Sequence, residues 1–347
     1  MLDSRKEKIL KAIIDDYILT GIPVGSRTLS KRKEIGVSSA TIRNDMADLE
    51  ELGFLEQPHT SAGRIPSDTA YRLYVDKLMP ITSLTKKEAQ EINVIFDHKM
   101  MQINEVVEKT ADVISKSTNH ISVVLAPQLK TATVGRIQLV KVSDTKVLVV
   151  IVTSSGIIRQ KVIKVKNDIS DDYVDMLSKM LTKHLADKKL VDAKAIIENV
   201  FMSEIKGHEK LFKSLLSSIY DTAESHTKKD IILGGANNIF NYPEYQDIDK
   251  AKGFLEVLET KEVLYEMLNQ ATDLEFSISI GHENNFEEMK NCSVVTATYR
   301  VGDKKLGSFG VIGPTRMDYS KVVTTLNYIS KSLNATLEGF IESKDDE

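Results

Sequence analysis

The segment GVSSATIRNDMADLEELGFL, residues 36–55, constrains the fold most, because it specifies one amphipathic helix together with its start and its end. Gly36 breaks the preceding structure, Ser38 or Ser39 suits the N-cap, and Gly53 suits the C-terminal end. The apolar positions recur at helical spacing on one face: Ile42, Met46 and Leu49. This pattern predicts a short helix that buries one side and leaves the other side polar.

Similar signals define the neighbours of this helix. An apolar stripe over residues 5–19 ends at Gly21 and Pro23, and Ser26 is expected to cap a short helix over RTLSKRKE. After the central helix, FLEQ predicts a strand, HTSAGR a turn around Gly63, and RIP a returning strand. The order of three helices and a hairpin predicts a winged helix-turn-helix over residues 1–80, which also contain a helix at about 68–78.

Positive charge is concentrated in this region. Between Arg27 and Asn44 the chain carries five positive side chains and a single acidic one, Glu34, whereas the net charge of the whole chain is −4. A protein with negative net charge binds nucleic acid only through a local basic surface. The second and third helices are therefore the predicted place for such a surface.

The polar face of the third helix fits a DNA major groove. Small residues there permit close approach, and Arg43 and Asn44 read base edges well. We predict base or near-base contacts from Ser39, Arg43 and Asn44, and backbone contacts from Ser26, Arg27, Lys31 and Arg64, the last near the hairpin tip. The complete predicted set is Ser26, Arg27, Lys31, Ser38, Ser39, Ala40, Thr41, Arg43, Asn44, Gly63 and Arg64. The alternatives are a solvated surface helix and a winged helix that contacts only protein.

The rest of the chain predicts a mixture of helices and strands. After a linker, MPITSLTKKEAQ, a helical stretch over 86–117 precedes a buried strand, HISVVLAP, and a three-stranded meander whose first turn is SDTK. Glycine and asparagine in DIILGGANNIF indicate a strand that ends in a turn. The predicted strands of the meander and of the C-terminal part are 133–143, 146–153, 157–165, 274–281, 292–301 and 304–312. The predicted helices are 170–186, 190–200, 207–226, 249–258, 260–270 and 318–341.

The sequence lacks the motifs of several common enzyme and metal sites. The sequence has no Walker loop, no dinucleotide fingerprint and no H-E-x-x-H, and its seven histidines lack metal-ligand spacing, so we expect no enzyme activity, cofactor or metal. The single cysteine, Cys292, excludes an intramolecular disulfide and is expected to be a buried thiol rather than a redox switch. The charged N-terminus and the short apolar run VLVVIV favour a cytoplasmic protein without a membrane segment.

Two glycine-rich segments allow two interpretations each. LGSFGVIGPTR, residues 306–316, fits either an anion-binding loop or a strand, a turn and the entry to the last helix, and Pro314 favours the second. LGGANNIFNYPEY, residues 233–245, fits a turn and loop, or alternatively one wall of a ligand pocket.

Three blocks of sequence resemble one family. GVSSATIRNDMADLEELGFLEQPHTSAGRIPSDTAYRLYVDKLM, NIFNYPEYQDIDKAKGFLEVLETKEVL and IGPTRMDYSKVVTTLNYIS closely resemble the heat-inducible transcription repressor family, HrcA. The resemblance covers nearly the whole chain, although residues 130–227 match in layout rather than in a motif.

The resemblance implies a function and a domain plan. Members repress the class I heat-shock operons, dnaK and groE, by binding the inverted-repeat operator CIRCE as homodimers, and the GroE chaperonin modulates their activity. The implied fold is α+β and multidomain: a winged helix-turn-helix (1–80), a GAF-like α/β domain (86–129 and 228–347), and an inserted dimerising domain (130–227) made of a three-stranded antiparallel sheet plus helices. An alternative keeps the DNA-binding domain and makes the GAF-like domain a sensor of a small molecule.

Overall fold

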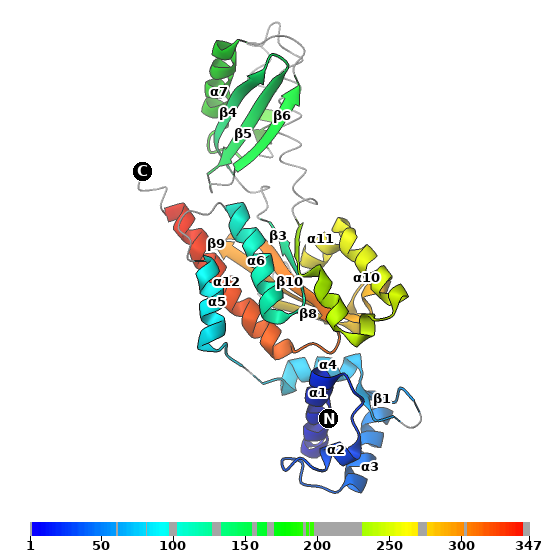
Figure 1. The fold of residues 1–347 in the computed structure, drawn as a ribbon. Helices are drawn as coiled ribbons and strands as arrows, with labels where there is room; N and C mark the ends of the chain where they lie inside the picture. Colours follow the sequence, from blue (N-terminus) through cyan, green and yellow to red (C-terminus); the bar gives the residue numbers. More distant parts are fainter. Residues whose placement is uncertain are drawn as a thin grey trace.

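The protein divides into three structural parts that follow one another along the view in Figure 1. The N-terminal helices lie at one end, a five-stranded sheet with helices on both faces lies in the middle, and a three-stranded sheet lies at the other end. The computed structural model describes residues 2–59, 62–80, 82–96, 103–126, 133–154, 158–164, 170–189, 192–193, 195–197, 231–269, 276–301 and 304–342.

The first helix, α1 (Ser4–Thr20), begins and ends where local chemistry requires it. The Asp3 carboxylate accepts hydrogen bonds from the backbone N–H groups of Arg5 at 3.0 Å and Lys6 at 2.8 Å, which satisfies two donors at the helix start. Gly21 ends the helix in the left-handed conformation, with φ of 64°.

Two further helices and a hairpin pack on α1. These are α2 (Ser26–Leu29), α3 (Ser39–Glu51), β1 (Leu55–Glu56) and β2 (Ile65–Pro66), the two strands pairing antiparallel. Helix α2 is shorter than predicted and ends at Leu29, because the polar run after Leu29 offers no apolar side chain to bury until Ile35. The shared core contains Ile9, Leu10, Ile13, Ile14, Leu29, Ile42, Met46 and Leu49.

Helix α4 (Asp68–Leu73) continues into a π-helical turn, η1 (Tyr74–Leu78), and the elements from α1 to η1 are called the N-terminal unit below. The single helical stretch predicted for 86–117 is found as two helices, α5 (Lys86–Phe96) and α6 (Ile103–Thr118). Residues 97–102 between them lie outside the described residues.

The central sheet contains five strands in the order β7-β3-β10-β9-β8, and every neighbouring pair is antiparallel. The strands are β3 (Ile121–Leu125), β7 (Ile231–Gly234), β8 (Phe276–Ile280), β9 (Cys292–Val301) and β10 (Lys304–Pro314). The strand predicted for 304–312 thus extends to Pro314. This sheet and its helices are called the core below.

Each face of the sheet has its own hydrophobic cluster. Alternation in β3 turns Val124 toward the cluster with α5, α6 and α12 (Tyr319–Glu342), and turns Val123 toward the cluster with α10 (Ile248–Glu259) and α11 (Lys261–Asn269). Short helical turns join these elements: η5 (Ala236–Asn241), η6 (Pro243–Tyr245), η7 (Gly281–Glu283) and η8 (Glu287–Met289).

The predicted three-stranded meander is present as β4 (Val134–Ser143), β5 (Lys146–Thr153) and β6 (Ile158–Lys164). Helix α7 (Asp171–Leu185) covers one face, and its Ser178 and Thr182 hydroxyls accept hydrogen bonds from backbone N–H groups of β4 at 2.9 and 3.1 Å. These bonds occupy the edge of β4 that has no strand beside it. Together, β4–β6 and α7 are called the three-stranded unit.

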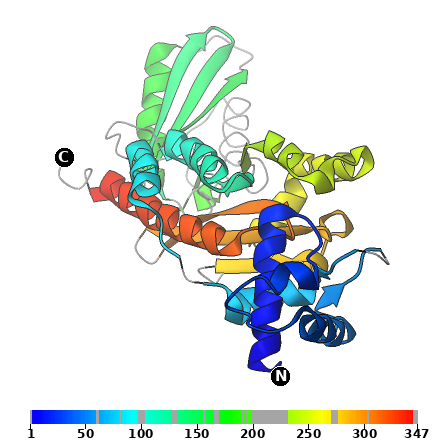
Figure 2. The same ribbon diagram turned by 60° about the horizontal axis from the view of Figure 1, so that its bottom comes forward.

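The three-stranded unit interrupts the central sheet in sequence but not in space. Strands β3 and β7 are neighbours, with Ser122 opposite Gly234, although the three-stranded unit lies between them along the chain. Both views place this unit at the opposite end of the core from the N-terminal unit (Figures 1 and 2). The helices predicted for 190–200 and 207–226 fall mostly or wholly outside the described residues.

Polar contacts join the N-terminal unit to the core. Arg72 of α4 donates to the backbone carbonyl of Ile278 at 2.6 Å and to Glu283 at 2.8 Å, and Asp68 accepts from the backbone and ring nitrogens of His282 at 2.9 and 2.7 Å. The fold is a mixture of α and β elements, as predicted. Within the described residues, no helix combines the length and the apolar composition needed to cross a bilayer.

Candidate nucleic-acid interface

The start of α3 is fixed by Gly36 and Ser38. Gly36 has φ of 63°, a left-handed conformation that glycine adopts readily, and it reverses the chain before the helix. The Ser38 hydroxyl accepts a hydrogen bond from the backbone N–H of Thr41 at 3.2 Å. Of the two serines predicted as alternative caps, Ser38 is therefore the N-cap and Ser39 is the first helical residue.

The predicted buried face of α3 is confirmed. Ile42, Met46 and Leu49 are buried, and a buried carboxylate, Asp45, lies beside them. Arg5 of α1 binds both oxygens of Asp45, at 2.8 and 2.9 Å. This bidentate pair fixes the rotation of α3 relative to α1 and thereby determines which α3 residues face outward.

Other acidic residues in the second half of α3 also have cationic partners. Lys6 lies 2.9 Å from Asp48, and Arg64 contacts Glu50 at 2.7 and 2.8 Å. These pairs reduce the negative field near the helix, so an anion approaching the first half of α3 meets less repulsion.

The outer face at the start of α3 is exposed. Ala40, Arg43 and Asn44 are exposed, and Ser39 and Thr41 are partly exposed. Within the described part of the chain, no ion pair engages the exposed cations of this region: Arg27, Lys31, Lys33 and Arg43. Arg32, in contrast, is paired with Asp16 and Glu34. Lys33 contributed to the charge excess but was not among the predicted contacts.

The prediction that Ser26 caps α2 is wrong. The N-cap is Gly25, which makes no side-chain hydrogen bond, and Ser26 is the first helical residue. The buried Ser26 hydroxyl instead lies 3.0 Å from the Ser39 hydroxyl. This bond joins the start of α2 to the start of α3.

The prediction that Arg64 lies near the hairpin tip is also wrong. Arg64 immediately precedes β2, and its backbone N–H and C=O both bond to Val24 at 2.9 Å, which places it at the base of the hairpin. Its side chain is held by Glu50. A Cβ on Gly63 would lie 2.4 Å from the carbonyl oxygen of Val24, so only glycine permits this close approach.

The glycine-rich segment 306–316 and Cys292 have structural roles. Strand β10 runs through most of LGSFGVIGPTR, which confirms the strand interpretation of that segment, and Arg316 after it binds Glu244. Cys292 is buried, its thiol lies 3.0 Å from the Tyr245 hydroxyl, and burial raises its pKa to about 12. Within the described residues, no cluster of histidine, cysteine or carboxylate side chains has the composition of a metal site.

Comparisons with known proteins agree with one another. Residues 104–323 match the family model described as HrcA protein C terminal domain. The chain is 42% identical over 339 residues to a Clostridium perfringens (strain 13 / Type A) protein, which is named heat-inducible transcription repressor HrcA, covering 97% of this chain and 99% of that protein. A Ruminiclostridium cellulolyticum protein of the same name is 42% identical over 337 residues, covering 96% of this chain and 97% of that protein.

One solved structure has the same fold over the whole chain. It is titled as the crystal structure of a hypothetical protein at 2.2 Å resolution and superimposes with a TM-score of 0.69 at 23% sequence identity. The match covers 98% of this chain and all of the other.

Proposed function

Because the chain belongs to the HrcA family of heat-inducible transcription repressors, we propose that α1–α3 and the β1–β2 hairpin form a winged helix-turn-helix that binds an inverted-repeat operator. The family is a class of repressors rather than of enzymes. The observation that carries the proposal is the unequal pairing of charges around α3. The exposed cations near its first turns have no ion-pair partner among the described residues, whereas Asp45, Asp48 and Glu50 farther along α3 are paired.

The first two turns of α3 are proposed to enter the major groove. Arg43 and Asn44 are exposed there and carry the donors and acceptors that read guanine and adenine edges, while Ala40 allows the helix to approach closely. Ser39 and Thr41 lie beside them. Arg27 and Lys31 are proposed to hold phosphates on the side of α2, and Ser38 at the helix start is proposed to do the same.

The remaining predicted residues are proposed to position the elements that face the DNA. Ser26 holds α2 against α3, Gly63 permits the hairpin to approach Val24, and Arg64 fixes the hairpin to Glu50. Each of these contacts sets the position of a DNA-facing element. We therefore assign Ser26, Gly63 and Arg64 to positioning rather than to direct DNA contact.

Dimerisation is proposed to use the three-stranded unit. One face of its sheet packs on α7, and the opposite face presents aliphatic side chains to solvent. The exposed members are Val140, Val142, Ile158 and Val162, of which Val142 is 57% exposed. An apolar sheet face of this kind suits a self-complementary contact with a second copy of the chain, and an inverted-repeat operator requires a two-fold dimer.

The domain plan implied by the resemblance is proposed with this assignment. The winged helix covers residues 1–80, a GAF-like domain covers 86–129 and 228–347, and the dimerising insertion covers 130–227. The three-stranded unit lies between β3 and β7 along the chain, although these two strands pair with each other in the central sheet, and this arrangement supports an insertion.

The proposed regulator is the GroE chaperonin, and the proposed targets are the dnaK and groE operons with their operator CIRCE. The family resemblance supports both. If the purified chain refolds fully from denaturant without chaperonin and recovers its operator affinity, the proposed dependence on GroE is wrong.

The proposal is tested by titrating the full chain against a CIRCE duplex, a duplex with one half-site, and a scrambled duplex of equal length, each at two salt concentrations. We expect selectivity for the complete inverted repeat and a steep decrease of affinity with salt. Equal affinity for the complete and scrambled duplexes at both salt concentrations would leave the unit as a protein-contact module.

A second candidate function adds small-molecule sensing by the GAF-like domain. It is favoured by a cavity whose lining includes Glu244 and Tyr245 of LGGANNIFNYPEY, the segment interpreted above as a possible wall of a ligand pocket.

A further inference from the structure

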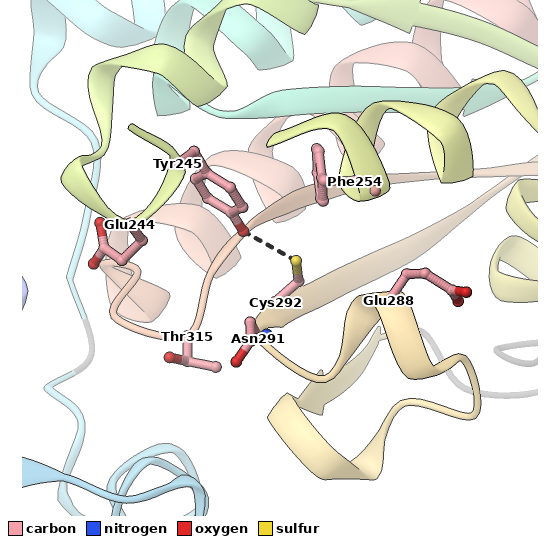
Figure 3. A pocket seen from close by; sticks show the side chains of 8 residues that line it. Glu244, Tyr245, Phe254, Glu288, Asn291, Cys292 and Thr315 are labelled. Carbon is pink, nitrogen blue, oxygen red and sulfur yellow. Dashed lines mark hydrogen bonds between the residues drawn. The ribbon is translucent and has the colours of Figure 1, made fainter. Parts of the chain in front are cut away.

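A cavity of about 260 Å³ opens in the core beside η6, α10 and the start of β9. Its wall includes the buried rings of Tyr245 and Phe254, whose centroids are 5.3 Å apart, and the buried thiol of Cys292 (Figure 3). The described residues that line it are Glu244, Tyr245, Gly253, Phe254, Glu288, Asn291, Cys292 and Thr315.

Gly253 contributes no side chain to the wall of the cavity. It lies in the interior of α10, where glycine costs about 0.5–1 kcal/mol relative to alanine. A Cβ at this position would have no atom within 4 Å, so neither close packing nor a left-handed backbone requires glycine here. The absent side chain instead leaves the helix wall of the cavity bare.

The residues that line the cavity favour a positively charged ligand. The described residues that line it combine an apolar wall with two carboxylates, Glu244 and Glu288, and include no lysine, arginine or histidine. Figure 3 shows these carboxylates on opposite sides of the rings of Tyr245 and Phe254. Aromatic faces and carboxylates both attract cations, and the apolar wall favours a hydrophobic body.

Glu244 connects this cavity to the N-terminal unit. Its carboxylate accepts hydrogen bonds from Nε of Arg316 and, at 3.1 Å, from Nη2. Nη1 of Arg316 donates to the backbone carbonyl of Ile18 in the last turn of α1 at 3.2 Å. A cation that draws Glu244 into the cavity therefore removes the partner that orients Arg316 toward α1.

We propose that this cavity binds a small organic cation, an ammonium or amidinium group on an apolar body, which competes with Arg316 for Glu244 and loosens the contact between the core and α1. The first part of this proposal, binding of the cation, is inferred from the cavity alone. The consequence for DNA rests on the proposed function.

The binding half is tested by calorimetry on the full chain with benzylammonium as the probe and benzyl alcohol as its neutral counterpart. We expect benzylammonium to bind at least tenfold more tightly than the alcohol, because only the cation engages the carboxylates. Glu244→Gln should reduce that preference. Gly253→Leu should abolish binding by filling the cavity, while Gly253→Ala serves as the matched control for the change in helix propensity.

Three results would overturn the site: no binding of benzylammonium to a folded chain, equal binding of the amine and the alcohol, or unchanged binding in Gly253→Leu. Circular dichroism of each variant shows that it is folded.

The regulatory half is tested by measuring operator affinity with and without saturating benzylammonium. We expect at least a fivefold loss of affinity in the wild type and none in Gly253→Leu. Unchanged affinity in the wild type contradicts the coupling while leaving the site intact. If the chain binds no operator at all, the proposed function and the coupling both fail, and the calorimetry still decides the binding site.

Discussion

Two pairs of arginines, in different regions of the protein, differ in whether their side chains have partners. At the outer surface of the N-terminal unit, Arg27 and Arg43 are exposed and unpaired within the described residues. Where that unit meets the core, Arg72 and Arg316 each bind a carboxylate and a backbone carbonyl. A paired guanidinium fixes the geometry of the molecule that holds it, whereas an unpaired one keeps its donors for an external anion. The difference separates arginines that hold the structure together from arginines that we propose bind DNA.

The largest expected effect comes from removing a paired arginine. Arg316 is buried, and Arg316→Ala leaves Glu244, whose side chain is 36% exposed, without its partner. Breaking a buried ion pair typically costs about 3–5 kcal/mol, and partial exposure of Glu244 places the expected loss of unfolding free energy at the lower end, about 3 kcal/mol. Urea denaturation followed by circular dichroism measures it, because the chain has no tryptophan. Arg27→Ala is the control and should unfold at the wild-type urea concentration.

Removal of an unpaired arginine should affect DNA binding and not stability. Arg43→Ala is expected to cost about 1–3 kcal/mol of binding free energy on the CIRCE duplex and to reduce the preference over a scrambled duplex. Lys183→Ala removes one positive charge from α7, at the opposite end of the molecule, and is the matched control. Anisotropy titrations compare the two. A lower urea midpoint for Arg43→Ala would assign this arginine to the structural group instead.

The paired region also predicts a pH dependence. Burial, with a smaller contribution from Arg316, lowers the pKa of His120 to about 4. The unfolded chain then binds the proton more tightly than the folded chain, so stability is present above the unfolded pKa and is lost as pH falls. Between pH 7 and pH 5 the wild type should lose about 2 kcal/mol more than His120→Gln. If the urea midpoints of the two proteins changed equally between pH 7 and pH 5, the claim that His120 is buried and neutral would be contradicted.

The smallest effect is expected at a phosphate contact. Lys31→Ala should weaken binding to the operator and to the scrambled duplex by the same factor, worth about 1 kcal/mol, because phosphates carry no sequence information. The salt dependence should become shallower by about one unit of slope. Titrations at several salt concentrations measure both quantities. A loss confined to the operator would move Lys31 from the phosphate group to the base-reading group.

The parts of the fold that depend on local periodicity were predictable from the sequence. The apolar spacing of Ile42, Met46 and Leu49 defines the buried face of α3. Alternation defines β4 and β5 of the three-stranded unit, whereas a continuous apolar run defines the fully buried strand β3. The ends of elements were less predictable. The helix expected over residues 27–34 ends at Leu29, because tertiary burial rather than propensity decides where a short helix stops.

The side-chain partners were not predictable from the sequence, because they join residues that are distant along the chain. Arg64 looked like a free cation in a glycine-containing turn, and only the fold brings it to Glu50. The same holds for Arg316 with Glu244, and for the cavity beside that pair, which elements from separate parts of the chain enclose. The sequence gives the number of charged side chains in the N-terminal unit, but only their ion pairs in the structure show which cations are left to bind an external anion.

The most direct test of the proposed DNA-binding surface removes its four exposed, unpaired cations around α2 and α3 together. The variant Arg27→Ala, Lys31→Ala, Lys33→Ala and Arg43→Ala is titrated against the CIRCE duplex, with its circular dichroism spectrum and urea midpoint measured in parallel. We predict a wild-type spectrum and midpoint together with loss of measurable operator binding. Retention of selective operator binding by the folded variant would contradict the claim that these unpaired cations form the DNA-binding surface.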